Sequence, residues 1–111
     1  MSGAEYDPGW LRHRVTVESG ASAPDGAGGE TVLWDTLATL WASVEPVSAG
    51  ETIVAGHLSG VVTHHVTFRF RDDLAGGMRV AFRGRTFRML AVHDPDESRR
   101  YLVAKCTEEA P

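Results

Sequence analysis

The segment VVTHHVTFRFRDD, residues 61–73, places two adjacent histidines close to two aspartates, and imidazole and carboxylate groups are common metal ligands. Apolar and polar residues alternate along this segment, which predicts a β-strand whose successive side chains point to opposite sides. His64 therefore belongs to the apolar face and His65 to the polar, arginine-bearing face. One metal ion cannot easily take both histidines, so the segment predicts one wall of a scaffold rather than a catalytic centre.

The other residues with metal-binding or nucleophilic groups form no recognisable site. The remaining histidines and aspartates lie in expected turns or element ends, without HxH, HExxH or paired-cysteine spacing. They are His57, His93, Asp72, Asp73, Asp94 and Asp96. The glycines of DGAGGE are not followed by Lys-Ser or Lys-Thr, so they do not predict a phosphate loop. Cys106 alternates with Leu102 and Ala104, which predicts a small core residue, the alternative being a reactive thiol. We expect no enzyme, no cofactor and no metal.

The composition predicts one globular domain, because 111 residues with 42% hydrophobic and 23% charged residues are ordinary for that class. We expect cytoplasmic synthesis and no membrane association, since no apolar run approaches about 20 residues and the start lacks a signal-peptide pattern. The formal net charge of −4 argues against nucleic-acid binding over the whole surface. The charge is also uneven, because no Lys or Arg occurs between Arg14 and Arg69. This asymmetry suits head-to-tail packing of copies, and equally suits local ion pairs.

A hydrophobic period of two runs along most of the chain and predicts strands. Around residues 87–92 apolar residues fall on both alternating sets, which predicts either a bulge or cover on both faces. Residues 19–30 are predicted to be a glycine-rich loop. Residues 48–59 are predicted to be a short helix, because Ser48 and Glu51 have capping-box spacing and Gly60 can end it.

Together these segments predict an all-β, mainly antiparallel fold. It would be a small β-barrel-like or sandwich domain of about 5–7 strands, with one short helix and long loops. The domain would span residues 11–109, after an N-terminal extension of residues 1–10.

Several blocks, in order, resemble the head-tail joining proteins of tailed bacteriophages, also called head-closure or stopper proteins. The blocks are LRHRVTV (11–17), DGAGGETVLW (25–34), LWASVEP (40–46), THHVTFR (63–69), MRVAFRGRTFRM (78–89) and VHDPDESRRYL (92–102). The resemblance implies a β-barrel-like fold whose copies form a ring, commonly hexameric, in the neck of the virion. It also implies that the ring helps to retain packaged DNA and docks the tail. Phage-derived gene transfer agents use similar necks, so the chain would suit such a particle as well.

The resemblance implies several neighbours. They are copies of the same chain, portal and adaptor proteins on the head side, a tail terminator or tail tube on the tail side, and double-stranded DNA that passes without sequence-specific binding. The expected location is the neck of a virion assembled in the bacterial cytoplasm. The candidate subunit or neck contacts are Trp34, Trp41, Ile53, Val54, Leu58, Arg69, Arg71 and Arg79. The candidate channel-facing residues are Glu30 and Glu51, because an acidic lining would let DNA slide.

Three other classes remain open at this point. A tail-terminator or other minor tail protein also assembles small β-rich domains into rings. A small nucleic-acid-binding β-barrel would use aromatics between basic residues, as in TFRFR and FRGRTFRM, although the overall acidity counts against it. An enzyme would need a metal or nucleophile constellation that the sequence does not show.

Overall fold

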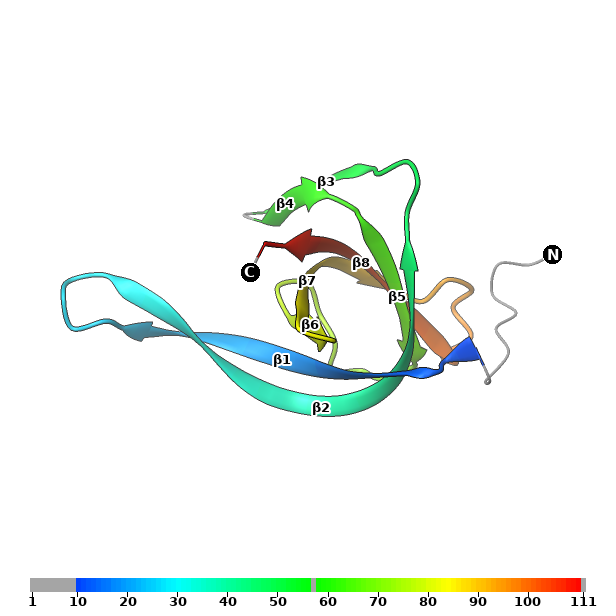
Figure 1. Ribbon diagram of the computed structural model, residues 1–111, viewed down its shortest axis with the longest axis horizontal. Helices are drawn as coiled ribbons and strands as arrows, with labels where there is room; N and C mark the ends of the chain where they lie inside the picture. The colour runs from blue at the N-terminus through cyan, green and yellow to red at the C-terminus, as the bar shows by residue number, and fades with distance from the viewer. Residues whose placement is uncertain (1–9, 57, 111) are drawn as a thin grey trace.

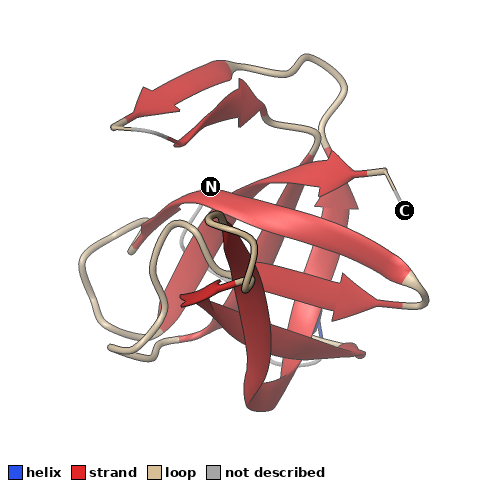
Figure 2. Ribbon diagram, turned by 90° about the vertical axis from the view of Figure 1, so that its left-hand side faces the viewer, coloured by secondary structure: helices blue, strands red, loops and turns tan. Residues whose placement is uncertain are grey.

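The computed structural model describes residues 10–56 and 58–110, and its elements are eight β-strands (Figures 1 and 2). The expected N-terminal extension, residues 1–10, lies outside the described residues except for Trp10. The strands are β1 (His13–Pro24), β2 (Glu30–Pro46), β3 (Thr52–Ala55), β4 (Leu58–Val61), β5 (His64–Arg69), β6 (Arg79–Phe82), β7 (Arg85–His93) and β8 (Tyr101–Glu109).

Six of the strands close into a barrel-like ring in the order β1-β2-β5-β8-β7-β6, with β6 pairing back onto β1. All neighbouring pairs are antiparallel. The prediction of an all-β, antiparallel, barrel-like domain is therefore confirmed. The strands number eight rather than about five to seven, because the segment predicted to be a helix contributes two short strands, β3 and β4.

The core of the ring is built from the alternating residues that the sequence pattern predicts. Its largest fully buried side chains are Phe68, Phe87 and Met89. Smaller apolar residues fill the space between them, and these include Val15, Val17, Val66, Val80, Ala104 and Cys106. Each strand of the ring thus turns one face inward. The packed ring is a rigid support for the exposed parts of the molecule.

The helix predicted for residues 48–59 is wrong, and this segment forms the hairpin β3–β4, which we call the cap (Figure 1). The residues Ile53 and Val54 are β-branched and favour extended backbone, and Gly56 adopts a positive φ of 62° in the turn. Four antiparallel residue pairs then outweigh the capping-box spacing of Ser48 and Glu51. In the described part of the chain, no helix has the length and apolar character needed to cross a membrane.

The glycine-rich loop predicted for residues 19–30 is also wrong in extent, since only residues 25–29 lie outside the strands. The small residues 19–24 continue β1 because they pair in register with the bulkier residues 30–35 of β2. We call this projection, residues 19–36, the arm. It extends away from the ring in Figure 1, and the molecule measures 53 × 27 × 26 Å. At the tip, the Asp25 carboxylate accepts hydrogen bonds from the N–H groups of Ala27 and Gly29 at 2.8 and 3.0 Å.

The ambiguous pattern in β7 is resolved by a β-bulge, as one of the two predicted alternatives requires. Met89 pairs with Cys106 and Ala91 with Lys105, which leaves Leu90 as the extra residue. The cap contacts β7 and β8 and covers Leu90, which is only 3% exposed. A Cβ atom on Gly60 would lie 3.3 Å from Leu90 Cδ1, so the cap approaches β7 at a glycine. Both predicted alternatives therefore hold: the bulge changes which side chains of β7 point into the ring, and the cap covers the outward-pointing Leu90.

Candidate functional site

The two adjacent histidines diverge, as the strand pattern predicts. His64 is 8% exposed and its ring meets Phe87 edge-on at 4.7 Å, whereas His65 is half-buried on the other face. An N–H of Arg85 approaches His64 Nε2 at 3.3 Å, so Nδ1–H donates to Thr63 Oγ1 at 2.9 Å. Burial and then the charge of Arg85 lower the pKa of His64, which keeps the ring neutral. This histidine has a structural role.

The remaining candidates for chemistry do not gather into a site. Among residues 10–56 and 58–110, no group of three or more His, Cys, Asp or Glu side chains could hold a metal ion. Cys106 is buried, as predicted for a core residue, and burial raises the pKa of its thiol to about 12. A thiol in this state is inert as a nucleophile.

The base of the arm is fixed to the ring by Trp34, whose indole packs against two arginines of neighbouring strands. The guanidinium of Arg79 on β6 stands 4.1 Å from the ring centroid, and that of Arg88 on β7 stands 4.8 Å from it. Arg79 also binds Glu18 of β1 at 2.6 Å, and Arg88 binds Glu109 of β8 at 3.3 Å. Trp34 and Arg79, both candidate contacts, thus hold the arm against its own barrel.

Gly20 is required beneath this tryptophan. It pairs with Trp34 across the arm, and a Cβ atom at this position would lie 2.8 Å from Val32 Cγ1 and 3.1 Å from the indole. Beside this contact, a cleft of about 410 Å³ separates the arm from the cap and the segment 76–78. The indole therefore rests on a glycine and walls the cleft.

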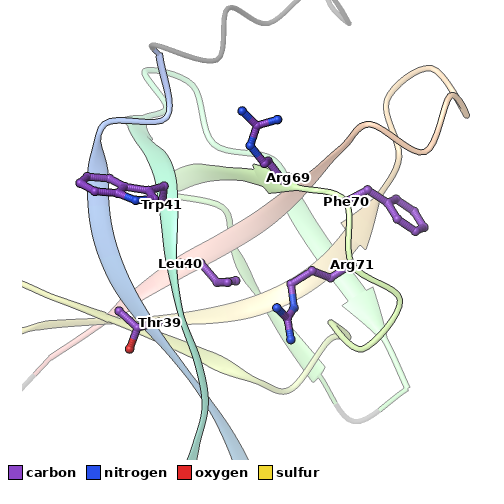
Figure 3. Close-up of a pocket in the computed structure, with 6 residues that line it drawn as sticks. All are labelled: Thr39, Leu40, Trp41, Arg69, Phe70 and Arg71. Atoms are coloured by element: carbon purple, nitrogen blue, oxygen red, sulfur yellow. The ribbon is translucent and has the colours of Figure 1, made fainter.

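A second cleft brings three candidate contacts together: Trp41, Arg69 and Arg71 (Figure 3). It has a volume of about 310 Å³ and lies between β2 and the end of β5; its other lining residues are Thr39, Leu40 and Phe70. We call it the Trp41 cleft. Figure 3 shows Arg69 and Arg71 extending in different directions from the chain.

The two arginines of the Trp41 cleft differ in their partners. Arg71 binds Asp73 through two N–H groups at 2.9 and 2.7 Å, which raises the pKa of Arg71 and lowers that of Asp73. Arg69 is exposed and has no ion-pair partner among the described residues. Trp41 is 51% exposed although Arg14 stacks on it at 4.9 Å. The cleft thus presents an open aromatic ring beside one free positive charge.

The three candidate contacts expected on a helix lie on the cap instead. Val54 is 76% exposed and Ile53 is half-buried. Leu58 turns toward the ring, since a Cβ atom on Gly76 would lie 3.3 Å from Leu58 Cδ1. Val54 is therefore the residue of this set that offers free apolar surface.

The two candidate channel-facing residues, Glu30 and Glu51, lie on different projections. Glu30 begins β2 at the tip of the arm and is exposed. Glu51 precedes the cap and binds Lys105 of β8 at 2.5 Å, which lowers the pKa of Glu51. The structure does not bring these carboxylates together.

The sequence did not reveal that apolar residues are exposed on the arm and at the bulge beside its base. Val32, Leu33 and Leu37 are 48%, 55% and 36% exposed. Leu37 is the extra residue of a second bulge, since Val17 pairs with Ala38 and Glu18 with Thr36. The alternation of residue types in ETVLWDTL, residues 30–37, is the signal for this part of β2. Because residues 19–30 are predicted to be a loop, the sequence does not show that this part of the strand pairs only with β1.

The arginines of the basic and aromatic segments are largely used within the chain. Arg85 forms a two-pronged ion pair with Glu108 at 2.8 and 2.9 Å and stacks on Phe87. Arg88 stacks on Trp34, and its Nε is buried without a hydrogen-bond partner. Groups held in this way are poorly placed to neutralise phosphates, which weighs against a nucleic-acid-binding barrel.

Known proteins share both the sequence pattern and the fold of this chain. Residues 6–109 match the family described as phage head completion protein. A similar solved chain belongs to the virion of a native gene transfer agent particle, with a TM-score of 0.67 and 24% identity over 89% of this chain and 94% of that one. Another is a solution structure of a Shigella flexneri 2a protein, with a TM-score of 0.67 and 26% identity over 95% and 98% of the two chains. No curated protein sequence matches.

Lowering the pH from about 7.5 to about 5.5 is expected to destabilise the fold. The unfolded His64 side chain takes up a proton near pH 6.5, whereas the pKa of the folded side chain is lower. The contribution of neutral His64 to the free energy of unfolding is therefore complete above the pKa of the unfolded side chain. It is lost as the pH falls toward the pKa of the folded side chain. His64→Gln should therefore shrink the difference between the urea-unfolding free energies at the two pH values.

His93→Gln is the matched variant for this pH test, because burial, followed by Lys105 and His65, also lowers the pKa of His93. Each substitution should remove its own share of the pH dependence. An unaltered pH dependence in His64→Gln would contradict the neutral state assigned to this ring.

Trp34→Ala is expected to loosen the arm while leaving the ring closed. Two cation–π contacts worth about 1–2 kcal/mol together are lost. Amide hydrogen exchange in residues 19–24 and 30–36 should then accelerate about tenfold, and exchange in β5 and β8 should stay unchanged. Trp41→Ala is the control, since Trp41 does not touch the arm; equal acceleration in both variants would refute the role of Trp34.

Proposed function

This chain belongs to the phage head completion protein family and is a structural virion protein rather than an enzyme, and we propose that it forms the ring that closes the neck. In this role the ring retains DNA after packaging and provides the surface on which the tail docks. Portal and adaptor proteins lie on its head side, and a tail terminator or tail tube on its tail side. The ring is hexameric in this proposal, and DNA passes through it without sequence-specific contact.

The exposed apolar arm is the observation that carries the proposal. Val32, Leu33 and Leu37 are exposed on a hairpin that projects beyond a closed ring, in a molecule about twice as long as it is wide. Soluble monomers rarely present apolar residues on such an extension unless a partner covers them. The fold shared with a chain of a gene transfer agent virion supports an assembly role in a phage or phage-derived particle.

Two other exposed features supply further contact surfaces in this proposal. The cap offers Val54, with Ile53 and Leu58 behind it, to the head-side or tail-side neighbour. The Trp41 cleft offers an open aromatic ring and a free arginine. Aromatic and arginine side chains are the residue types most enriched at protein interfaces.

The acidic arm tip supports a lining past which DNA can slide. Asp25 and Glu30 lie at the tip, and no Lys or Arg occurs between Arg14 and Arg69. Carboxylates repel phosphates, whereas cations would hold them. Glu30 is therefore assigned to the channel, together with Glu51, although Glu51 is partly neutralised by Lys105.

The first test adds the purified chain to DNA-filled heads that lack a neck. We expect the packaged DNA to become protected from nuclease and the heads to become competent for tail attachment, as measured by the DNA digested over time and by tailed particles. Binding with continued leakage would favour tail joining without closure. A failure to bind heads would overturn the proposal and favour a tail-terminator or minor tail protein.

Glu30→Arg is expected to slow DNA ejection from completed particles, because a ring of such variants places new cations where phosphates pass. Ejection followed by fluorescence of a DNA dye should slow several-fold at low salt and recover at high salt. Glu97→Arg makes the same charge change in the exposed 94–100 segment and should leave ejection unaltered. Identical kinetics for Glu30→Arg and the unmodified chain would remove Glu30 from the channel.

A further inference from the structure

We infer that the outer face of the arm of one copy docks in the Trp41 cleft of the next copy. This inference rests on the proposed ring and specifies the contact that builds it. The outer face of the arm consists of Leu33 and Asp35, with Leu37 at the adjoining bulge.

The outer face of the arm has no cover within its own chain. Leu33 and Asp35 alternate with Trp34 along β2, so they point away from Arg79 and Arg88. Leu33 is 55% exposed, and Asp35 is exposed without an ion-pair partner among the described residues. The face thus offers apolar groups on either side of one free carboxylate.

The Trp41 cleft has the complementary chemistry. Its apolar lining comes from Leu40, Trp41 and Phe70, and Trp41 is half exposed. Arg69 provides a free positive charge at this cleft, in contrast to Arg71, which Asp73 neutralises. Leucine side chains against the tryptophan, with a carboxylate at the arginine, would bury apolar area and pair two charges that are otherwise unpaired.

The occupant must come from another copy, because both surfaces lie on the same strand. Leu33 and Leu40 are both in β2, and seven residues of extended chain separate them by roughly 20 Å. The arm extends to one side of the ring and β5, which ends at Arg69, lies on the other (Figure 1). Two different surfaces at opposite sides of one subunit produce a head-to-tail contact, and such contacts form a ring when the rotation between copies closes.

A second copy also fits better than an unrelated partner. The arm carries Asp25, Glu30 and Asp35 and no Lys or Arg. The Trp41 cleft carries Arg69, the first basic residue after Arg14, and Arg71. The uneven distribution of charge along the sequence thus becomes an attraction between neighbouring copies.

Cysteine crosslinking on neckless heads tests the contact. The variant with Leu33→Cys and Thr39→Cys places one thiol on the arm and one in the cleft, and Cys106 stays inert because burial raises the pKa of its thiol. After binding to heads and mild oxidation, we expect a ladder of covalent oligomers ending at the full ring. The control pairs Leu33→Cys with Arg83→Cys, in the exposed turn between β6 and β7, and should give no ladder.

The possible results separate this contact from the proposed function. If heads close but no ladder forms, or if the control pair gives the same ladder, the arm-to-cleft contact is overturned and the neck ring stands. If the unmodified chain does not bind heads, the neck function itself fails.

A charge exchange gives an independent measurement without cysteines. Asp35→Arg and Arg69→Asp should each lower the amount of protein retained per head about tenfold, and the double variant should recover to within about threefold of the unmodified chain. Glu97→Arg and Arg83→Asp are the single-charge controls and should retain full binding. A loss of about a hundredfold in the double variant, the product of two independent tenfold losses, would overturn the pairing of Asp35 with Arg69.

Discussion

The barrel closes through a short seam between β1 and β6, and the position of the arm depends on it. Only three residue pairs, from Thr16 to Glu18 on β1, join these strands. The ion pair between Glu18 and Arg79 lies at the last pair, and Trp34 stacks on the same arginine. A short ladder is thus reinforced by a partly buried ion pair and an aromatic ring at its open end, where hydrogen bonds alone would fray.

The seam also decides where the arm begins. The bulge at Leu37 lies directly opposite the step from Val17 to Glu18 on β1, where the side chains pass from the core to the surface. Beyond this point β1 and β2 pair only with each other, and the residues of β1 change from the core residue Val17 to the small side chains of the arm. The bulge bends β2 so that the arm leaves the ring while its base stays under Arg79 and Arg88.

The sequence predicted the ring well and both projections poorly. Alternation identified the ring strands because one face of each is buried, as along Val15 and Val17 and from Val66 to Phe68. The β1 half of the arm lacks this signal, since its small residues acquire strand structure only from cross-strand partners such as Leu33 and Trp34. The cap was mistaken for a helix because apolar spacing in a short segment does not separate a hairpin from two helical turns.

The candidate contacts were identified by residue type, and only the structure shows which are available. Tryptophans and arginines all look alike in the sequence, yet Trp34 packs against two arginines and Trp41 is half exposed. Arg79 and Arg71 have carboxylate partners, and Arg69 has none among the described residues. The distinction depends on pairings across strands that are distant in the sequence, such as Glu18 with Arg79.

The long strand β2 gives the molecule a particular mechanical response. It runs without interruption from the arm tip into the ring, where five of its residues pair with β5. A pull on the arm along its axis would therefore load the β2–β5 and β1–β6 hydrogen bonds across their length, in shear, because these bonds lie perpendicular to the strands. Bonds loaded together resist tension better than bonds that open one after another, so a protein held by its arm resists a pull along β2 without unzipping.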